Sequence, residues 1–331
     1  MNRHPDIDKA KGLAILFVVF GHLVARADPL GVQWYEPLRR AVYAFHMPFF
    51  LYLSGMVAVL SGSLFTRPGG WPGLLKQRAI RLLVPFFGIG LVIVLAKLAA
   101  SRIMFVDNAP LGIWAGISSM VWDTSHSAAI SIWYLFVLFV LSLACPLLLR
   151  GQATRLPVLL AVTLLLYAAG LPAYCYLDHI GRYAVFFVLG ALAANAGDRW
   201  NNMLDRHWRV FFLLFAMGFL ADMAWGRNWP LAPVLLVLGT VSMPALHGLV
   251  RSFPVTSLQS LHVLGRYCFV IYLFNTMFIG LTKGLLLHVA GWDGWHFLPF
   301  AAAMMAAGLS GPLMLKFLLL RRNRFLDRLT S

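Results

Sequence analysis

The chain has 331 residues, of which 60% are hydrophobic and only 12% are charged. Soluble globular domains carry about 25% charged residues, so this composition excludes a soluble enzyme and a disordered chain. A transmembrane helix uses about 20 apolar residues, and a chain of this length therefore accommodates about ten of them. The composition predicts an all-α polytopic membrane protein.

Ten apolar stretches predict a bundle of about ten transmembrane helices. They cover residues 10–26, 41–60, 80–100, 129–149, 156–172, 183–196, 208–224, 231–250, 267–288 and 297–320. The apolar stretch 111–122 is too short to span and is expected to lie in the interface or to re-enter. No linker is long enough to separate domains, so residues 1–331 are predicted to form a single membrane-embedded domain.

Lysine and arginine total 27 against 12 acidic residues, which gives a net charge of +15. Most of these cations fall in the connections on the side that carries the N-terminus, a bias that predicts both termini in the cytoplasm. There they set the topology and meet anionic lipid headgroups, so a nucleic-acid partner is not expected. Neither the cysteines nor the histidines show the spacing of metal ligands, and no metal is predicted.

The first predicted helix contains two basic residues at opposite depths. Lys11 lies at its cytoplasmic mouth, and His22 follows eleven residues later, about 16 Å along the helix axis. Ionisable groups at membrane depth are costly, which makes His22 a functional candidate by default. An imidazole titrates near neutrality and can act as a general base on a hydroxyl. The alternative is a neutral histidine that hydrogen-bonds a neighbouring helix.

The second predicted helix places a further histidine, His46, near its outer end, with Pro48 two residues on. Because the first two helices run antiparallel, His22 and His46 are expected to meet in the outer half of the bundle. His46 taken alone is equally consistent with an interfacial polar anchor.

Arg78 and Arg81 stand three residues apart at the cytoplasmic entrance to the third predicted helix, and so share one helix face. Guanidinium groups bind phosphate bidentately, so this pair suits a phosphorylated cofactor. The competing interpretation is a positive-inside anchor that contacts lipid phosphate.

Three further residues are candidates for lining a substrate. Trp133 and Tyr134 begin the fourth predicted helix, where interfacial belt aromatics are the common alternative. Asn275 is an amide within an apolar helix and serves either as interhelical glue or as a group that orients substrate. Glu36 is the only glutamate and is expected in an exposed outer loop, so a pair of catalytic glutamates is excluded.

Six short motifs follow one another along the chain. They are DxxKG with a histidine eleven positions after its lysine (Asp8 to His22), HMPFFxxxSG (His46 to Gly55), RxxRLxxP (Arg78 to Pro85), WYLxxLF (Trp133 to Phe139), FFxLG (Phe186 to Gly190) and LGRYxxxIYLFN (Leu264 to Asn275). Each motif alone is weak evidence, whereas the ordered set covers nearly the whole chain. With these motifs the chain resembles the acyltransferase-3 family of integral membrane O-acyltransferases.

The resemblance implies a bundle of about ten helices in the bacterial cytoplasmic membrane. It implies transfer of an acyl group, usually acetyl, from cytosolic acyl-CoA to a hydroxyl of a glycan or lipid-linked sugar. By position, His22 is the implied main catalytic residue and Lys11 its motif partner, while His46 lines the site. Arg78 and Arg81 are implied to hold the donor. Many relatives have a histidine where this chain has Asn275, and an amide cannot replace its proton chemistry.

The residues also leave open a proton-coupled transporter or exporter of an anionic small solute, which would use the same basic entrance and buried histidines. Such transporters often contain paired inverted repeats with broken helices at matching positions, and no such pairing is evident here. Direct acyl transfer and an acyl-histidine relay are both compatible with the residues, as are acetyl and succinyl groups.

Overall fold

The computed structural model describes residues 4–24, 31–102, 106, 108–254 and 256–330. These residues contain helices and turns and no strand, which confirms the all-α class. Eight helical stretches are long and apolar enough to cross a membrane. The other two predicted spans are also helical but shorter, with 17 residues in α1 (Pro5–Gly21) and 13 in α8 (Leu156–Ala168).

The chain divides into two compact units, which are described separately. The first comprises Met1–Leu53 and Ala196–Ser331, and the second comprises Ser54–Asn195. The third helix, α3 (His46–Leu60), is continuous across the boundary between them.

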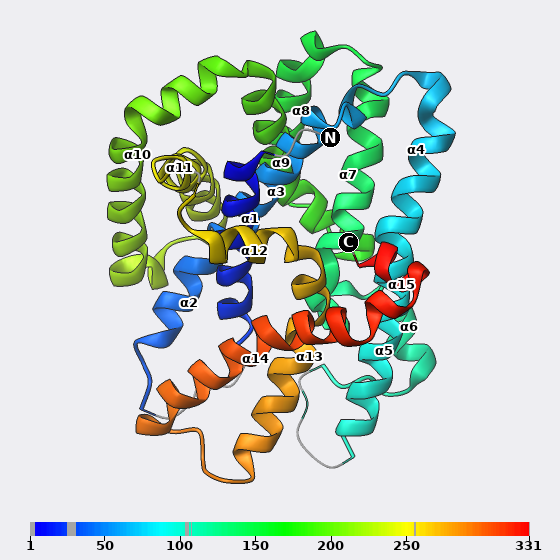
Figure 1. Ribbon diagram of the computed structural model, residues 1–331, viewed down its shortest axis with the longest axis vertical. Helices are drawn as coiled ribbons and strands as arrows, with labels where there is room; N and C mark the ends of the chain where they lie inside the picture. The colour runs from blue at the N-terminus through cyan, green and yellow to red at the C-terminus, as the bar shows by residue number, and fades with distance from the viewer. Residues whose placement is uncertain (1–3, 25–30, 103–105, 107, 255, 331) are drawn as a thin grey trace. The chain divides into compact units, whose positions relative to one another are not determined.

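The first unit packs its helices mainly in sequential pairs (Figure 1). Helix α10 packs along α11, α13 packs along α14, and α1 lies against α12. Besides α1 and the start of α3, its helices are α2 (Tyr35–Tyr43), α10 (Asp198–Trp225), α11 (Leu231–Arg251), α12 (Gln259–Arg266), α13 (Cys268–Leu287), α14 (Phe297–Leu318) and α15 (Arg324–Leu329).

The second unit surrounds α7 with α4, α8 and a π-helical turn, η3. Its elements after α3 are α4 (Trp71–Arg78), η3 (Ala79–Leu83), α5 (Val84–Ala100), α6 (Ile113–Ser119), α7 (Trp133–Leu149), α8 and α9 (Leu177–Ala196). The segment predicted to be too short to span forms only the seven-residue α6.

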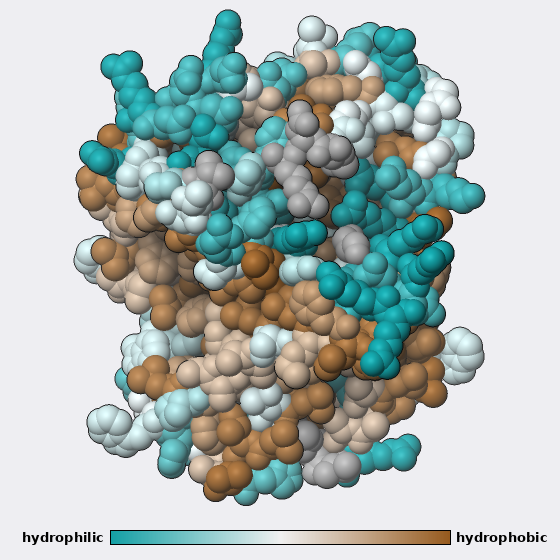
Figure 2. Space-filling model, viewed as in Figure 1, coloured by the Kyte–Doolittle hydropathy of each residue, from teal (hydrophilic) through white to brown (hydrophobic). Residues whose placement is uncertain are grey.

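Hydrophobic side chains are exposed on the outside of the helices, as a lipid-facing surface requires. Figure 2 shows them gathered over α13 and α14, whereas hydrophilic side chains cover the C-terminal end of the chain. Among them, the side chains of Leu285 and Leu298 are 72% and 65% exposed. In water, a monomer would rarely tolerate an apolar surface of this extent.

Two helix boundaries differ from the predicted ones. Helix α1 ends at Gly21, so His22 caps the helix instead of lying inside it; Arg26, the predicted end of this span, and Arg3, used to predict orientation, lie outside the described residues. The second predicted span is broken at Ala44 and Phe45 into α2 and α3. Glu36 accordingly lies in a helix and not in a loop.

Candidate active site

His22 and His46 lie at the facing ends of two helices of the first unit. His22 follows the last residue of α1, and His46 is the first residue of α3. Tyr43 contacts both ends: its hydroxyl donates to the carbonyl of Gly21 at 3.0 Å, and its ring lies 4.9 Å from that of His46. The helical hydrogen-bonding pattern breaks at Ala44 and Phe45, and His46 begins α3 with its side chain buried.

The two histidines differ in their hydrogen bonds. The Nδ1 of His46 lies 2.9 Å from the carbonyl oxygen of Val42, and a carbonyl only accepts, so this nitrogen carries the proton. In a neutral ring, Nε2 of His46 is then left as the acceptor. His22 is half-buried and makes no hydrogen bond through its ring to the described residues. Both histidines thus keep a nitrogen that a substrate can use.

Helix α2 fixes the end of α1 on which His22 sits. The hydroxyl groups of Tyr35 and Tyr43 donate to the carbonyls of Phe20 and Gly21 at 3.2 and 3.0 Å, and Arg39 Nη1 donates to the carbonyl of Val24 at 3.1 Å. These carbonyls belong to the last turn of a helix and the residues just after it, where few backbone donors remain; that of Phe20 also accepts from the N–H of Leu23 at 3.2 Å. Three side chains four residues apart therefore satisfy this end of α1.

Lys11 is on the same helix as His22 but about 16 Å away along its axis, so the two side chains act at different depths. The Lys11 ammonium lies 3.7 Å from Asp8 Oδ1, and both side chains are about one quarter exposed.

Arg78 and Arg81 flank the junction between α4 and η3 in the second unit. Arg78 is the last residue of α4, and Arg81 lies within the π-helical turn, so the α-helical spacing that predicted one shared face does not apply between them. Their charges nevertheless interact. Arg78 Nη2 donates to Ser63 Oγ at 2.7 Å, while its buried Nε has no hydrogen-bond acceptor among the described residues.

The three remaining candidates have different surroundings. The hydroxyl of Tyr134 lies 2.5 Å from Ser54 Oγ, and its side chain is buried, whereas Trp133 is half-buried. Asn275 is fully buried, and its Nδ2 donates to the carbonyls of Ile271 and Tyr272 in its own helix. The Asn275 Oδ1 has no donor among the described residues. With both of its N–H groups used in this way, Asn275 is not arranged as a donor to a developing oxyanion.

A family model described as an acyltransferase domain matches residues 4–316 of the chain. The chain belongs to the acyltransferase-3 family. Two curated relatives are both called nodulation protein NolL. The protein from Sinorhizobium fredii is 29% identical over 235 residues, which cover 69% of this chain and 59% of the relative. The one from Mesorhizobium japonicum is 26% identical over 237 residues, which cover 69% and 58%.

The chain thus matches less than two thirds of the length of these relatives. No solved structure gives a significant match.

The glycines in the motifs of this acyltransferase-3 chain mark close approaches between helix backbones. A Cβ on Gly12 would overlap the carbonyl of Leu261, and one on Gly265 would overlap the carbonyl of Asp8, so α1 and α12 touch through their main chains. In the second unit, a Cβ on Gly55 would overlap the carbonyl of Phe187 on α9. Small residues allow such close packing within membranes.

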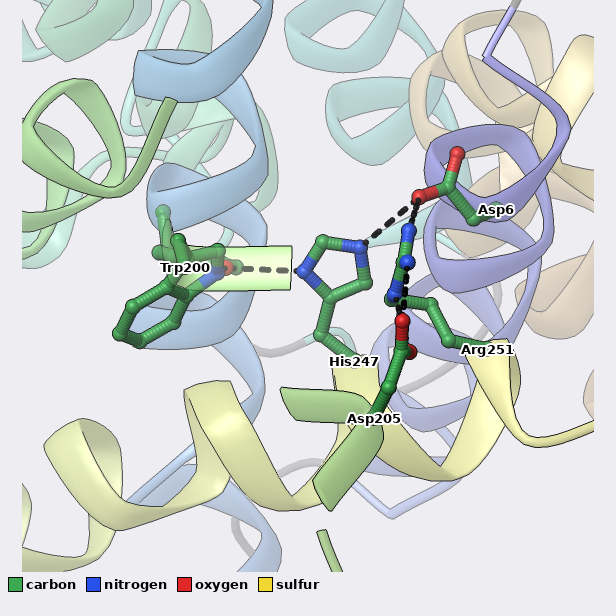
Figure 3. A network of polar contacts seen from close by, with 6 residues as sticks. Asp6, Trp200, Asp205, His247 and Arg251 are labelled. Carbon is green, nitrogen blue, oxygen red and sulfur yellow. Dashed lines mark hydrogen bonds and ion pairs between the residues drawn. The ribbon is translucent and has the colours of Figure 1, made fainter. Parts of the chain in front are cut away.

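A buried polar network in the first unit was not predicted (Figure 3). Trp200 Nε1 donates to the hydroxyl of Tyr52 at 2.9 Å, and this hydroxyl lies 2.8 Å from His247 Nδ1. On the other side of the ring, His247 Nε2 lies 3.5 Å from Asp6 Oδ2. The ring of His247 thus lies between the Tyr52 hydroxyl and the Asp6 carboxylate, and the contact with Asp6 is too long to count as a hydrogen bond.

Arg251 completes the network on the side of Asp6. It donates to Asp6 Oδ2 at 2.8 Å and to both carboxylate oxygens of Asp205 at 3.0 and 2.9 Å. Burial opposes ionisation of Asp6, but its interactions with His247 and Arg251 outweigh burial, so the pKa of this carboxyl lies below its ordinary value. The network joins α1, α3, α10 and α11, and a histidine inside an apolar helix was the one sequence feature that pointed to it.

The described residues contain no group of three or more histidine, cysteine or acidic side chains arranged to hold a metal ion.

Proposed function

We propose that this chain is a membrane O-acyltransferase that moves an acyl group, most often acetyl, from cytosolic acyl-CoA to a hydroxyl of a glycan or lipid-linked sugar. The observation that carries the proposal is the pairing of His22 and His46, each with a ring nitrogen that no described residue occupies. Membership of the acyltransferase-3 family supports the reaction class.

In the proposed reaction, His22 accepts the proton of the acceptor hydroxyl as its oxygen attacks the thioester carbonyl. A new C–O bond forms, the tetrahedral intermediate collapses, and the C–S bond breaks to release the thiolate of coenzyme A. The proton held on His22 then passes to that thiolate, so the ester and the free thiol are the only products. His46 lines the site and, through Nε2, can accept a hydrogen bond from a neighbouring hydroxyl of the acceptor.

Arg78 and Arg81 are proposed to bind the phosphates of the acyl-CoA. The unsatisfied Nε of Arg78 supports this role, because a buried guanidinium N–H without an acceptor is unfavourable until a ligand supplies one. Their position at the start of the third predicted span places them on the cytoplasmic side, where the donor is made available.

The acceptor is proposed to be a glycan, reached from the outer side of the bacterial cytoplasmic membrane. Both curated relatives come from bacteria and bear the name of a nodulation protein, and the chain covers a little under 60% of each. Mass spectrometry of surface glycans from strains with and without the gene would identify the transferred group and its recipient together.

Substitution of the histidine tests the enzymatic proposal. His22→Ala should lower acyl transfer by the purified, reconstituted protein at least about a hundredfold, the scale of a lost general base. His288→Ala is the matched control, since this exposed histidine is bonded only to a carbonyl of its own helix. Normal transfer by His22→Ala would rule out the mechanism, and solute uptake without acyl-CoA consumption would favour a transporter.

A further inference from the structure

A group of aromatic rings joins the N-terminal ends of α7 and α9 in the second unit. The ring of Trp133, the first residue of α7, lies 4.5 Å from the His179 ring and 4.8 Å from the Tyr183 ring. The His179 and Tyr183 rings are 6.1 Å apart on the same side of α9. Three rings from two helices therefore form one continuous aromatic surface.

Charged groups border this surface and reach solvent. Asp178 Oδ1 lies 2.8 Å from His179 Nδ1, and the two side chains are 21% and 22% exposed. The exposed Arg182 interacts electrostatically with Asp178. A carboxylate, an imidazole and a guanidinium group, each at least partly exposed, thus belong to this part of α9.

A second aromatic pair in the same unit is more exposed than the cluster around Trp133. The rings of Trp122 and Tyr174 lie 5.5 Å apart, and the two residues are 66% and 54% exposed. This high exposure is typical of aromatic residues that sit at the level of the lipid headgroups. The cluster around Trp133 is less exposed and includes a carboxylate in contact with an imidazole, a combination that a lipid anchor does not need.

We infer that Trp133, His179 and Tyr183, with Asp178 and Arg182, form a subsite that binds a sugar ring of the acceptor. This inference rests on the proposed function and identifies residues that would bind the acceptor of that reaction. A sugar presents an apolar C–H face, which suits an aromatic surface, and an edge of hydroxyls, which suits planar charged groups that both donate and accept. Binding sites commonly combine aromatic walls with a few polar groups in this way.

The position of the cluster along the chain agrees with an acceptor that arrives from outside. Counting the predicted spans from a cytoplasmic N-terminus puts the beginnings of the fourth and sixth on the outer side, which includes Trp133 and the segment from Asp178 to Tyr183. The end of the first span, near His22, is predicted on the same side of the membrane.

The test uses the full-length protein in proteoliposomes and, as probe, unacylated surface oligosaccharides isolated from a strain that lacks the gene. Trp133→Ala and His179→Ala should each raise the KM for the oligosaccharide about tenfold, which corresponds to about 1.4 kcal/mol of lost binding. The KM for acyl-CoA should stay within twofold of the wild-type value. Trp122→Ala is the matched control and should leave both KM values unchanged.

A conservative variant controls for the case in which the alanine variant does not fold. Trp133→Phe retains an aromatic face and should recover most of the acceptor affinity even if Trp133→Ala fails to fold. An unchanged acceptor KM in folded His179→Ala, or an equal rise in Trp122→Ala, would overturn the subsite and indicate a lipid-facing belt instead.

Binding of the same oligosaccharides to the wild-type protein without acyl-CoA, measured by calorimetry, separates the two proposals. Binding that is weakened by His179→Ala, together with a wild-type protein that transfers no acyl group once acyl-CoA is added, would support the subsite and contradict the proposed reaction. Acyl transfer that is insensitive to the substitutions would support the reaction and contradict the subsite.

Discussion

Tyr43 packs edge-on against His46, with ring centroids 4.9 Å apart, and its hydroxyl donates to the carbonyl of Gly21 at 3.0 Å. Gly21 is the residue just before His22, so one tyrosine contacts the ring of one histidine and holds the backbone next to the other. The relative position of the two imidazoles therefore depends on a side chain that has no proton-transfer role of its own.

Replacing Tyr43 by phenylalanine should keep the ring contact with His46 and remove the hydrogen bond to Gly21. We expect a loss of about 1 kcal/mol in stability, because the carbonyl of Gly21 loses its donor. Acyl transfer should fall about tenfold as the end of α1 becomes less well positioned. Thermal unfolding in detergent and initial rates measure the two effects. Tyr174→Phe is the control on an exposed tyrosine, and an equal loss there would contradict the prediction.

Arg78→Lys should raise the KM for acyl-CoA about tenfold with little change in kcat. Lysine preserves the charge but has neither the Nε donor nor the planar fork that binds phosphate through two hydrogen bonds. The measurement is the dependence of the initial rate on acyl-CoA concentration. Lys76→Ala, an exposed cation on the same helix, serves as the control. If both variants shift the KM equally, general electrostatic attraction explains the donor affinity and a specific site at Arg78 does not.

The existence of the helices could be predicted from apolar stretches, because lipid requires every backbone polar group to be satisfied within a helix. The ends of these helices were harder to predict from the sequence. The break at Ala44 and Phe45 lies within an apolar run where hydropathy is continuous, and the nearby Pro48, which has no backbone N–H to donate, is the local sequence feature that marks it. The early end of α1 at Gly21 depends on donors from α2, which only tertiary structure brings into place.

The residues of the candidate site could likewise be predicted only in part. His22 and His46 stood out as ionisable groups in apolar surroundings, and their proximity followed from the antiparallel order of the first two helices. Tyr43 was not identified, since a tyrosine near a helix end is common at membrane interfaces. The partner of His247 was equally hidden, because Asp6 is 241 positions away along the chain. Neither partner has a local sequence pattern that identifies it.

The network around Asp6 should make stability depend on pH in the acidic range. A carboxyl whose pKa is lower in the folded protein stabilises the fold above its ordinary pKa of about 4, and this contribution is lost as the pH falls below that value. Asp6→Asn should therefore unfold at a lower temperature than the wild type at pH 7, with a loss of about 2 kcal/mol. The difference in melting temperature between the two proteins should shrink between pH 5 and pH 3.

Asp198→Asn provides the comparison, since Asp198 is exposed. It should have the melting temperature of the wild type at each pH. A constant difference between wild type and Asp6→Asn from pH 7 to pH 3 would show that the carboxylate charge of Asp6 does not stabilise the fold.

Gly12 and Gly280 should respond to the same substitution in opposite directions. A methyl group at Gly12 would collide with the main-chain carbonyl of Leu261, and a backbone cannot rotate away as a side chain can. Gly12→Ala should therefore force α12 away from α1 and destabilise the protein by about 1–3 kcal/mol. Gly280 faces open space within α13, so Gly280→Ala should be neutral or stabilise by up to about 1 kcal/mol through its higher helix propensity. Equal melting temperatures for the two variants would contradict the close approach of α1 and α12 on which the placement of the first motif depends.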